Sequence, residues 1–200
     1  MVRRFFVLEE GAKERYVVQL VPLSASDIRL ALGRAQRMSS FQCGRTFRDG
    51  FKPEIGISAV GFEKMFPSLK QPNEKKHVWV DGKGRKIKLC TKRRAIETGT
   101  EYLHDASATT KDCASDVDLF VFASVEMPRC WRDSFPSQSE LESPENYRLW
   151  LCGWMGREEF NLKARSVDRG KSESPTWSAS ADCKSIKHHE LHPLFNKGGK

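Results

Sequence analysis

The sequence predicts an α/β domain in which helices flank a small mixed β-sheet. The nearly continuous apolar runs at 117–125 and 147–154 are typical of strands that are covered on both faces. Segments 26–38 and 58–66 carry apolar residues at near-helical spacing. Two pairs of β-rich runs, each separated by a short polar turn, indicate hairpins. These three observations together favour helices packed on a mixed sheet.

The first predicted hairpin joins strands 5–8 and 16–21 through a turn that contains Gly11. Pro22 is expected to stop the second strand, because proline cannot donate to a strand ladder. Ser24 or Ser26 can then cap the helix that ends near residue 38. The chain therefore begins with a hairpin followed by a helix.

The middle of the chain alternates between loops and short elements. Residues 39–56 have no steady period and are predicted to form a long loop, followed by helix 58–66. Residues 67–76, with two prolines, read as a linker. A second hairpin is expected at 77–80 and 85–91, across the turn from Asp81 to Gly84.

The C-terminal part adds to the sheet and then becomes polar. Residues 129–146 look like an insertion between the two apolar strands, and a short helix starts at Gly156. Residues 166–182 carry five serines without a period, which indicates a loop. We predict one domain over 1–200, with a hairpin at 1–22, a core at 23–165 and a loop with a C-terminal segment at 166–200.

The charge balance points to an anionic partner. The chain has 34 Lys and Arg against 26 Asp and Glu, a net charge of +8, and nucleic acid is the commonest partner of such proteins. No run reaches the roughly 18 apolar residues of a membrane helix. The six cysteines are spread singly, which favours reduced thiols and a cytoplasmic location.

The second hairpin carries the densest positive charge. Between Lys75 and Arg94 there are nine Lys or Arg and one acid, Asp81. Such a cluster suits phosphate contacts, although a solvated basic surface explains it equally well. The candidate nucleic-acid-binding residues are Lys83, Arg85, Lys86, Lys88, Lys92, Arg93 and Arg94.

Strand alternation divides this segment between two faces. Ile87, Leu89 and Thr91 fall on one face of the predicted strand. Lys86, Lys88 and Cys90 fall on the other. We expect the second face to carry any chemistry.

Short motifs follow one another in a fixed order from residue 30 to residue 194. They are an Ala- and Arg-rich helix at 31–37, Gly61-Phe-Glu63, Ile87-Lys-Leu-Cys-Thr91 followed by Lys92-Arg-Arg94, an apolar strand that starts at Asp118, Gly153-Trp-Met155 with Glu159-Phe160, and Leu191-His-Pro-Leu194. This order resembles phage-encoded members of the PD-(D/E)XK nuclease superfamily. The resemblance implies that family's fold, a small mixed sheet flanked by helices.

The resemblance also implies positions for a metal site. Family members hold Mg²⁺ with carboxylates from the helix and hairpin, and a Lys two residues after a strand carboxylate helps to orient water. Glu63 and Asp81 correspond to the helix and hairpin carboxylates, although Asp81 could equally be a turn residue. The strand carboxylate and the catalytic Lys are replaced by Lys88 and Cys90. An ammonium about 4 Å from Mg²⁺ would repel it by several kcal/mol.

Three functional hypotheses follow. In the favoured one, a nuclease-like protein, phage-derived by resemblance, binds nucleic acid or another macromolecule without cutting and needs no cofactor. In the second, a Mg²⁺-dependent endonuclease or exonuclease holds the ion with Glu63, Asp81 and Asp118 and uses Lys88 or Lys92 as general base or phosphate ligand. In the third, the fold is a scaffold for a virion component or a host-factor-binding protein. A site that has migrated to Asp112, Asp116 and Asp118 is a variant of the second, with Asp112 and Asp116 otherwise turn and cap residues.

Overall fold

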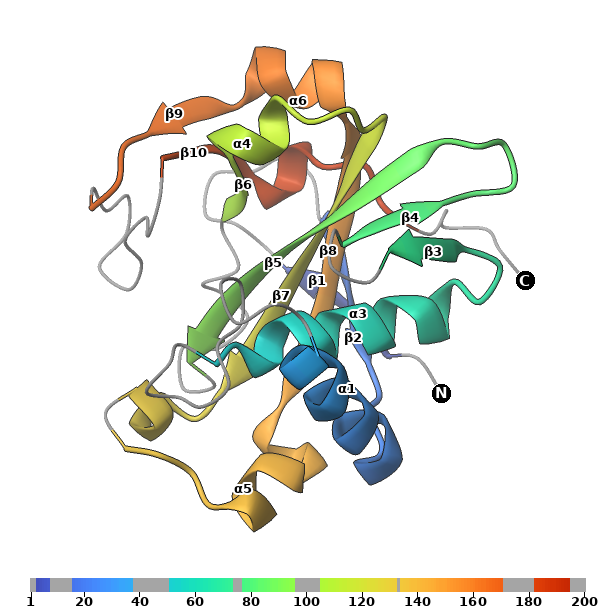
Figure 1. The fold of residues 1–200 in the computed structure, drawn as a ribbon. Coiled ribbons are helices and arrows are strands. Elements are labelled where there is room, and N and C mark those ends of the chain that lie inside the picture. Colours follow the sequence, from blue (N-terminus) through green and yellow to red (C-terminus); the bar gives the residue numbers. More distant parts are fainter. Residues whose placement is uncertain are drawn as a thin grey trace.

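The computed structural model describes residues 3–7, 16–37, 51–73, 77–95, 105–132, 134–170 and 182–194. These residues form a mixed α/β fold with one large and one small sheet (Figure 1). The strands of the large sheet are β1 (Arg3–Val7), β2 (Tyr16–Val21), β3 (Lys70–Asn73), β4 (Val78–Val80), β5 (Lys86–Ala95), β7 (Leu119–Met127) and β8 (Arg148–Gly156). Their order across the sheet is β1-β2-β8-β7-β5-β4-β3.

The small sheet has the order β6-β10-β9. Its strands are β6 (Asp105–Thr109), β9 (Arg165–Val167) and β10 (Cys183–Lys187). The helices are α1 (Ala25–Arg37), α3 (Pro53–Met65), α4 (Thr110–Cys113), α5 (Gln138–Glu142) and α6 (Arg157–Lys163), with 3-10 turns at Arg129–Arg132, Pro144–Asn146 and His188–Glu190. Among these described helices, none has both the length and the apolar character needed to cross a membrane.

A parallel pair of strands, β5 and β7, lies at the centre of the large sheet. Their register runs without a break from Ile87 opposite Leu119 to Ala95 opposite Met127. The other described pairings in this sheet are antiparallel. The predicted central strand is confirmed, because β7 is buried along nearly its whole length.

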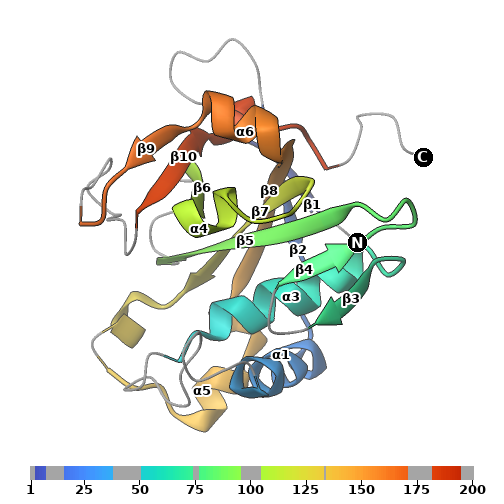
Figure 2. The same cartoon turned by 45° about the horizontal axis from the view of Figure 1, so that its top comes forward.

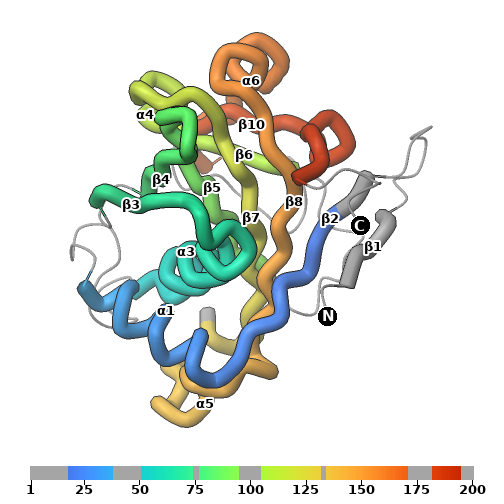
Figure 3. The backbone as a smooth tube through the Cα atoms, turned by 90° about the vertical axis from the view of Figure 1, so that its right-hand side faces the viewer, coloured from blue at the N-terminus to red at the C-terminus, as the bar shows by residue number. Residues whose placement is uncertain are grey.

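Each face of the large sheet has its own core. Helices α1 and α3 cover one face, which we call the helix face, and bury Ile28, Ile57 and Phe62 against it. The opposite face, called the second face, lies under α4, α6 and the small sheet (Figures 2 and 3). Its core contains Phe120, Phe122 and Phe160, whose rings contact one another.

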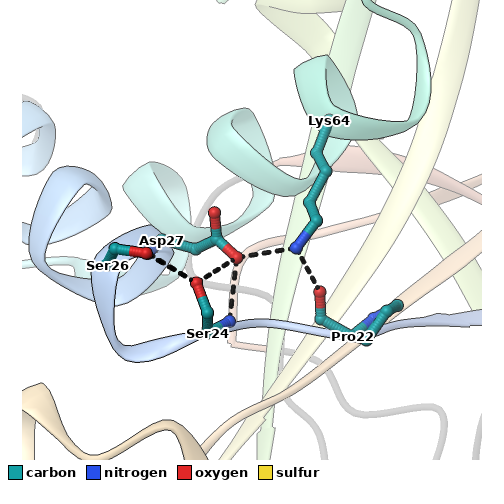
Figure 4. A network of polar contacts seen from close by, with 5 residues as sticks. All are labelled: Pro22, Ser24, Ser26, Asp27 and Lys64. Atoms are coloured by element: carbon teal, nitrogen blue, oxygen red, sulfur yellow. Dashed lines mark hydrogen bonds and ion pairs between the residues drawn. The ribbon is translucent and has the colours of Figure 1, made fainter.

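A polar network fixes the start of α1 against the end of α3 (Figure 4). The Ser24 hydroxyl accepts a hydrogen bond from the Asp27 backbone N–H, and the Asp27 carboxylate accepts one from the Ser24 N–H. This reciprocal arrangement caps the helix, so of the two predicted caps Ser24 holds that role. Lys64 then donates to the Asp27 carboxylate at 2.7 Å and to the Pro22 carbonyl at 2.9 Å.

Several predicted boundaries need correction. Helix α3 begins at Pro53 rather than near residue 58, because proline is well suited to the first turn of a helix. The predicted linker 67–76 contains the edge strand β3, and β5 extends beyond residue 91 to Ala95. The 129–146 insertion contains α5, and the small sheet is absent from the sequence-based prediction.

The N-terminal hairpin stays a prediction. Strand β1 pairs antiparallel with β2, but the turn around Gly11 lies outside the described residues. The predicted loop is likewise described only from residue 51 onward. By contrast, the end of β2 at Val21, directly before Pro22, agrees with the prediction.

Gly56 sets how closely α1 and α3 approach, and its replacement should be costly. A Cβ on Gly56 would overlap the backbone carbonyl of Ala31 and crowd the Ala35 Cβ at 3.1 Å. We expect Gly56→Ala to lower the free energy of unfolding by about 2–3 kcal/mol, since backbone must move. Chemical denaturation would measure this.

Gly33→Ala is the matched control for that prediction. Gly33 also lies inside a helix, but its added Cβ would meet only the Arg37 side chain at 3.6 Å. This change should be neutral or stabilising by up to about 1 kcal/mol. Equal effects of the two substitutions would contradict the close approach at Gly56.

Candidate functional site

Strand β5 divides its side chains between the two faces as the sequence predicts. Ile87 and Leu89 belong to the core under the helices, and the Thr91 hydroxyl lies 2.6 Å from the Ser58 hydroxyl of α3. Cys90 belongs to the core of the second face. Lys88 and Cys90, the two positions at which the resemblance implies substitutions, therefore lie on the side away from α3.

Lys88 is held by a carboxylate from the layer that covers the second face. Its Nζ lies 3.0 Å from Oδ1 of Asp112, and its side chain is 19 % exposed. Asp112 is itself fixed in α4, where its backbone N–H donates to the Thr109 hydroxyl and its other oxygen accepts from that hydroxyl at 2.7 Å. The strand position thus carries a cation that is paired with an anion from α4.

Cys90 is buried next to this ion pair. Desolvation raises the pKa of the Cys90 thiol well above its ordinary value, with a further contribution from the Asp112 charge. The neutral thiol is therefore the stable form at neutral pH, and it packs as a small apolar side chain. A neutral thiol is a poor metal ligand, because the thiolate is the form that binds metal.

Glu63 lies on the helix face and is clamped by two neighbours. Both of its oxygens accept from the Arg34 guanidinium, at 2.7 and 3.0 Å, and one also accepts from the Trp79 indole N–H at 2.9 Å. Arg34 additionally contacts the Gln71 side-chain oxygen. The bidentate pair joins α1 to α3, and Trp79 ties it to β4.

Asp81 and Asp118 each satisfy backbone groups. The Asp81 carboxylate accepts from the backbone N–H groups of Lys83 and Arg85 and from the Arg85 side chain, so it organises the β4–β5 turn. Asp118 accepts from the Lys86 backbone N–H at 2.6 Å. Within the described part of the chain, no three His, Cys, Asp or Glu residues form a metal-holding group, and Glu63, Asp81 and Asp118 do not meet.

The basic run does not form one continuous exposed surface. Lys86 pairs with Asp116, as Lys88 pairs with Asp112. Arg85 pairs with Asp81 at 2.8 Å, and Lys83 is exposed at the turn. Two of the three acids of the migrated site considered from the sequence are thus paired with lysines, and the third, Asp118, accepts from a backbone N–H.

The last three cations of the basic run also divide between the two faces of the large sheet. Arg93 lies on the helix face, where its charge acts on the buried Glu54 carboxylate. Burial raises the pKa of Glu54. Lys92 and Arg94 occupy the second face, in register with Ser124 and Glu126 of β7.

Two rows of polar side chains cross the second face at this point. We call them the polar ladder, which consists of Lys92, Ser124 and Trp150 in one row and Arg94, Glu126 and Arg148 in the next. Glu126 is 0 % exposed and lies 4.0 Å from Arg148. The sequence analysis missed the polar ladder because Ser124 and Glu126 stand within an apolar run. Their spacing of two residues, which places both side chains on one face of a strand, was the signal available.

Lys92 is the lysine of the ladder, and its pKa is lowered. Burial, and then the charge of Arg94, lower the pKa of Lys92 from 10.5 to about 7. Its ammonium donates to the Asp105 carbonyl at 3.5 Å. A buried amine that titrates near neutrality can change its charge in response to a ligand.

We predict that Glu63 acts structurally through Arg34. Arg34→Met should lower the free energy of unfolding by about 1–3 kcal/mol, because Glu63 then loses two charge-assisted hydrogen bonds. Arg29→Met, at an exposed position of the same helix, should change it by less than about 0.5 kcal/mol. Denaturant unfolding of both variants measures the difference, and equal values would refute the clamp.

Lys92 should make stability depend on pH. Between pH 7 and 9 the unfolded chain holds a proton on Lys92 that the folded chain has lost, so its contribution to stability rises with pH. Lys92→Met removes this contribution, and its stability relative to the parent should fall by about 2 kcal/mol over that range. Urea unfolding at pH 6, 7, 8 and 9 tests this. A constant difference between the two proteins would contradict a lowered pKa.

Comparisons of the chain with protein-family models, with curated proteins and with solved structures found no match.

Proposed function

We propose that this chain is a nuclease-like protein that binds nucleic acid without cutting it. The observation that carries the proposal is the ion pair between Lys88 and Asp112. By the motif resemblance, Lys88 stands where PD-(D/E)XK nucleases have a metal-binding carboxylate. The same proposal includes three further points that come from the resemblance. They are a PD-(D/E)XK nuclease-like fold, a phage-type origin and a location in the host cytoplasm.

The charges around Lys88 support the absence of cleavage. An ammonium cannot donate an electron pair to Mg²⁺, and at about 4 Å it repels the ion by several kcal/mol. The Lys88 ammonium also pairs with the Asp112 carboxylate, so this carboxylate is already engaged. The remaining motif residues are engaged elsewhere, Glu63 by Arg34 and Asp81 by its own turn.

The rest of the molecule supports binding to a polyanion. The net charge of +8 supplies long-range attraction to a nucleic-acid backbone. The turn that carries Lys83 and Arg85 is exposed, and the Arg85 side chain is 53 % exposed although it pairs with Asp81. We therefore expect phosphate contacts at this turn, with modest sequence preference.

The first test combines cleavage and gel-shift assays. The purified chain should shift single- or double-stranded DNA in Mg²⁺ or Mn²⁺ and leave it intact, with affinity that falls steeply with salt. Lys83→Gln should weaken the shift by about twofold to fivefold, because one phosphate contact is lost. Lys163→Gln, which removes an exposed cation of α6, is the matched control.

Metal-dependent cleavage that is lost in Lys88→Ala or Glu63→Ala would overturn the proposal in favour of an active nuclease. A chain that shifts no DNA would instead favour the scaffold role. Lys88→Asp combined with Cys90→Lys should gain Mg²⁺ affinity by calorimetry, since it restores both motif positions. If the lysine introduced by Cys90→Lys prevents folding, the single variant Lys88→Asp still tests the gain of Mg²⁺ affinity.

A further inference from the structure

The turn between β4 and β5 projects from one corner of the large sheet (Figures 1 and 2). In the last row where three strands pair, Lys70 of β3 lies opposite Val80 of β4, and Val80 lies opposite Lys86 of β5. The chain before β3 turns back towards α3, because the Leu69 side chain packs against the core of the helix face. Beyond this row, the hairpin consists of the turn 81–85.

Hydrogen bonds fix the shape of the projecting turn. The Asp81 carboxylate accepts from the backbone N–H groups of Lys83 and Arg85 at 2.9 and 3.0 Å. The Asp81 N–H in turn donates to the Arg85 carbonyl at 3.1 Å. Gly84 has a φ of +79°, a conformation that residues with a Cβ rarely adopt. A turn that is fixed in this way loses little conformational entropy on binding.

The turn is also narrow at its tip. Gly82 and Gly84 carry no Cβ, and an added Cβ at either position would meet nothing within 4 Å. Paired strands lie about 4.8 Å apart, and the turn reaches roughly 7 Å past Val80, the length of two extended residues. The major groove of a DNA duplex is about 12 Å wide and about 8.5 Å deep, and it admits a two-stranded β-ribbon. The turn therefore matches this groove in width and depth.

Two exposed lysines of this corner have no ion-pair partner among the described residues. Lys83 lies at the tip of the turn, and Lys70 lies at its base, where β3 begins. The neighbouring acids are already engaged, since Asp81 and Asp116 each pair with another cation and Asp118 accepts from a backbone N–H. Lys83 can therefore reach a phosphate on the wall of a groove, and Lys70 one on its rim.

We propose that the β4–β5 turn enters the major groove of a DNA duplex, with Lys70 on a phosphate at the rim of the groove. The inference rests on the nucleic-acid binding proposed above and names the form of nucleic acid that is bound. A single strand offers no groove to a turn of this shape. Duplex RNA does not fit either, because its major groove is too deep and narrow for protein side chains to read.

Fluorescence anisotropy with one DNA duplex and its two separated strands, at equal length and salt concentration, is the first test. The duplex should bind about tenfold more tightly than either strand, because only the duplex has a groove. Bulky groups on C5 of the pyrimidines lie in the major groove and should weaken binding about fivefold, whereas a bound minor-groove ligand should have no effect. Equal binding of duplex and strands, or sensitivity to the minor-groove ligand instead, would overturn the proposal.

Gly82→Val widens the tip without changing its charge. Because the new side chain extends into open space, thermal unfolding of the variant should match that of the parent. Duplex affinity should fall about fivefold, since the wider tip clashes with the groove, and Gly82→Ala should have a smaller effect. Affinity for the single strands should stay unchanged in both variants. Equal duplex affinities of the parent and Gly82→Val would contradict insertion.

Lys70→Gln tests the contact at the rim. This change should weaken duplex binding about threefold and reduce the slope of log affinity against log salt by about one, because one phosphate contact is lost. Lys52→Gln is the matched control, because it removes an exposed lysine whose charge acts on Glu54, as that of Arg93 does, at the other end of β5. The control should leave affinity and slope unchanged, and equal losses in the two variants would refute the rim contact.

Failure of this inference and failure of the proposed function give different results. A parent protein that binds neither the duplex nor the single strands refutes nucleic-acid binding itself. A parent that binds DNA, but is insensitive to Gly82→Val and to the C5 substituents, keeps the proposed function and refutes the insertion into the groove.

Discussion

The parallel pairing of β5 with β7 is the constraint on which the other features depend. Nine consecutive pairs fix the register from Ile87 opposite Leu119 to Ala95 opposite Met127. Both faces of this pair are buried, so a slip of one residue would move every apolar side chain to the wrong core. The same register decides which β5 cations face α3 and which face the small sheet.

This division explains why the charge density of the sequence differs from the charge on the surface. A run of cations in sequence looks like a binding strip, but alternation sends every second side chain to the opposite face. Lys88 then meets Asp112, and Arg93 lies on the side of Glu54. Within this run, Lys83 and Arg85 at the turn remain exposed.

Local sequence patterns predict much of the fold but little of the candidate site. Helix α1, the β4–β5 hairpin and the central strand follow from periodicity and turn residues within short windows. The small sheet does not, because β10 pairs with β6 across a long stretch of chain and both strands are short. For the same reason the partner of Lys88 could not be predicted, since Asp112 reaches it only when α4 is placed over the second face.

The Lys88–Asp112 pair reverses the polarity of the metal site that the motif resemblance implies. In such a site a strand carboxylate attracts a cation, whereas here a strand cation attracts a carboxylate from the covering layer. The ion pair keeps this half-buried region neutral, because each of the two charges compensates the other. The strand position therefore presents a positive charge where the resemblance implies a negative one.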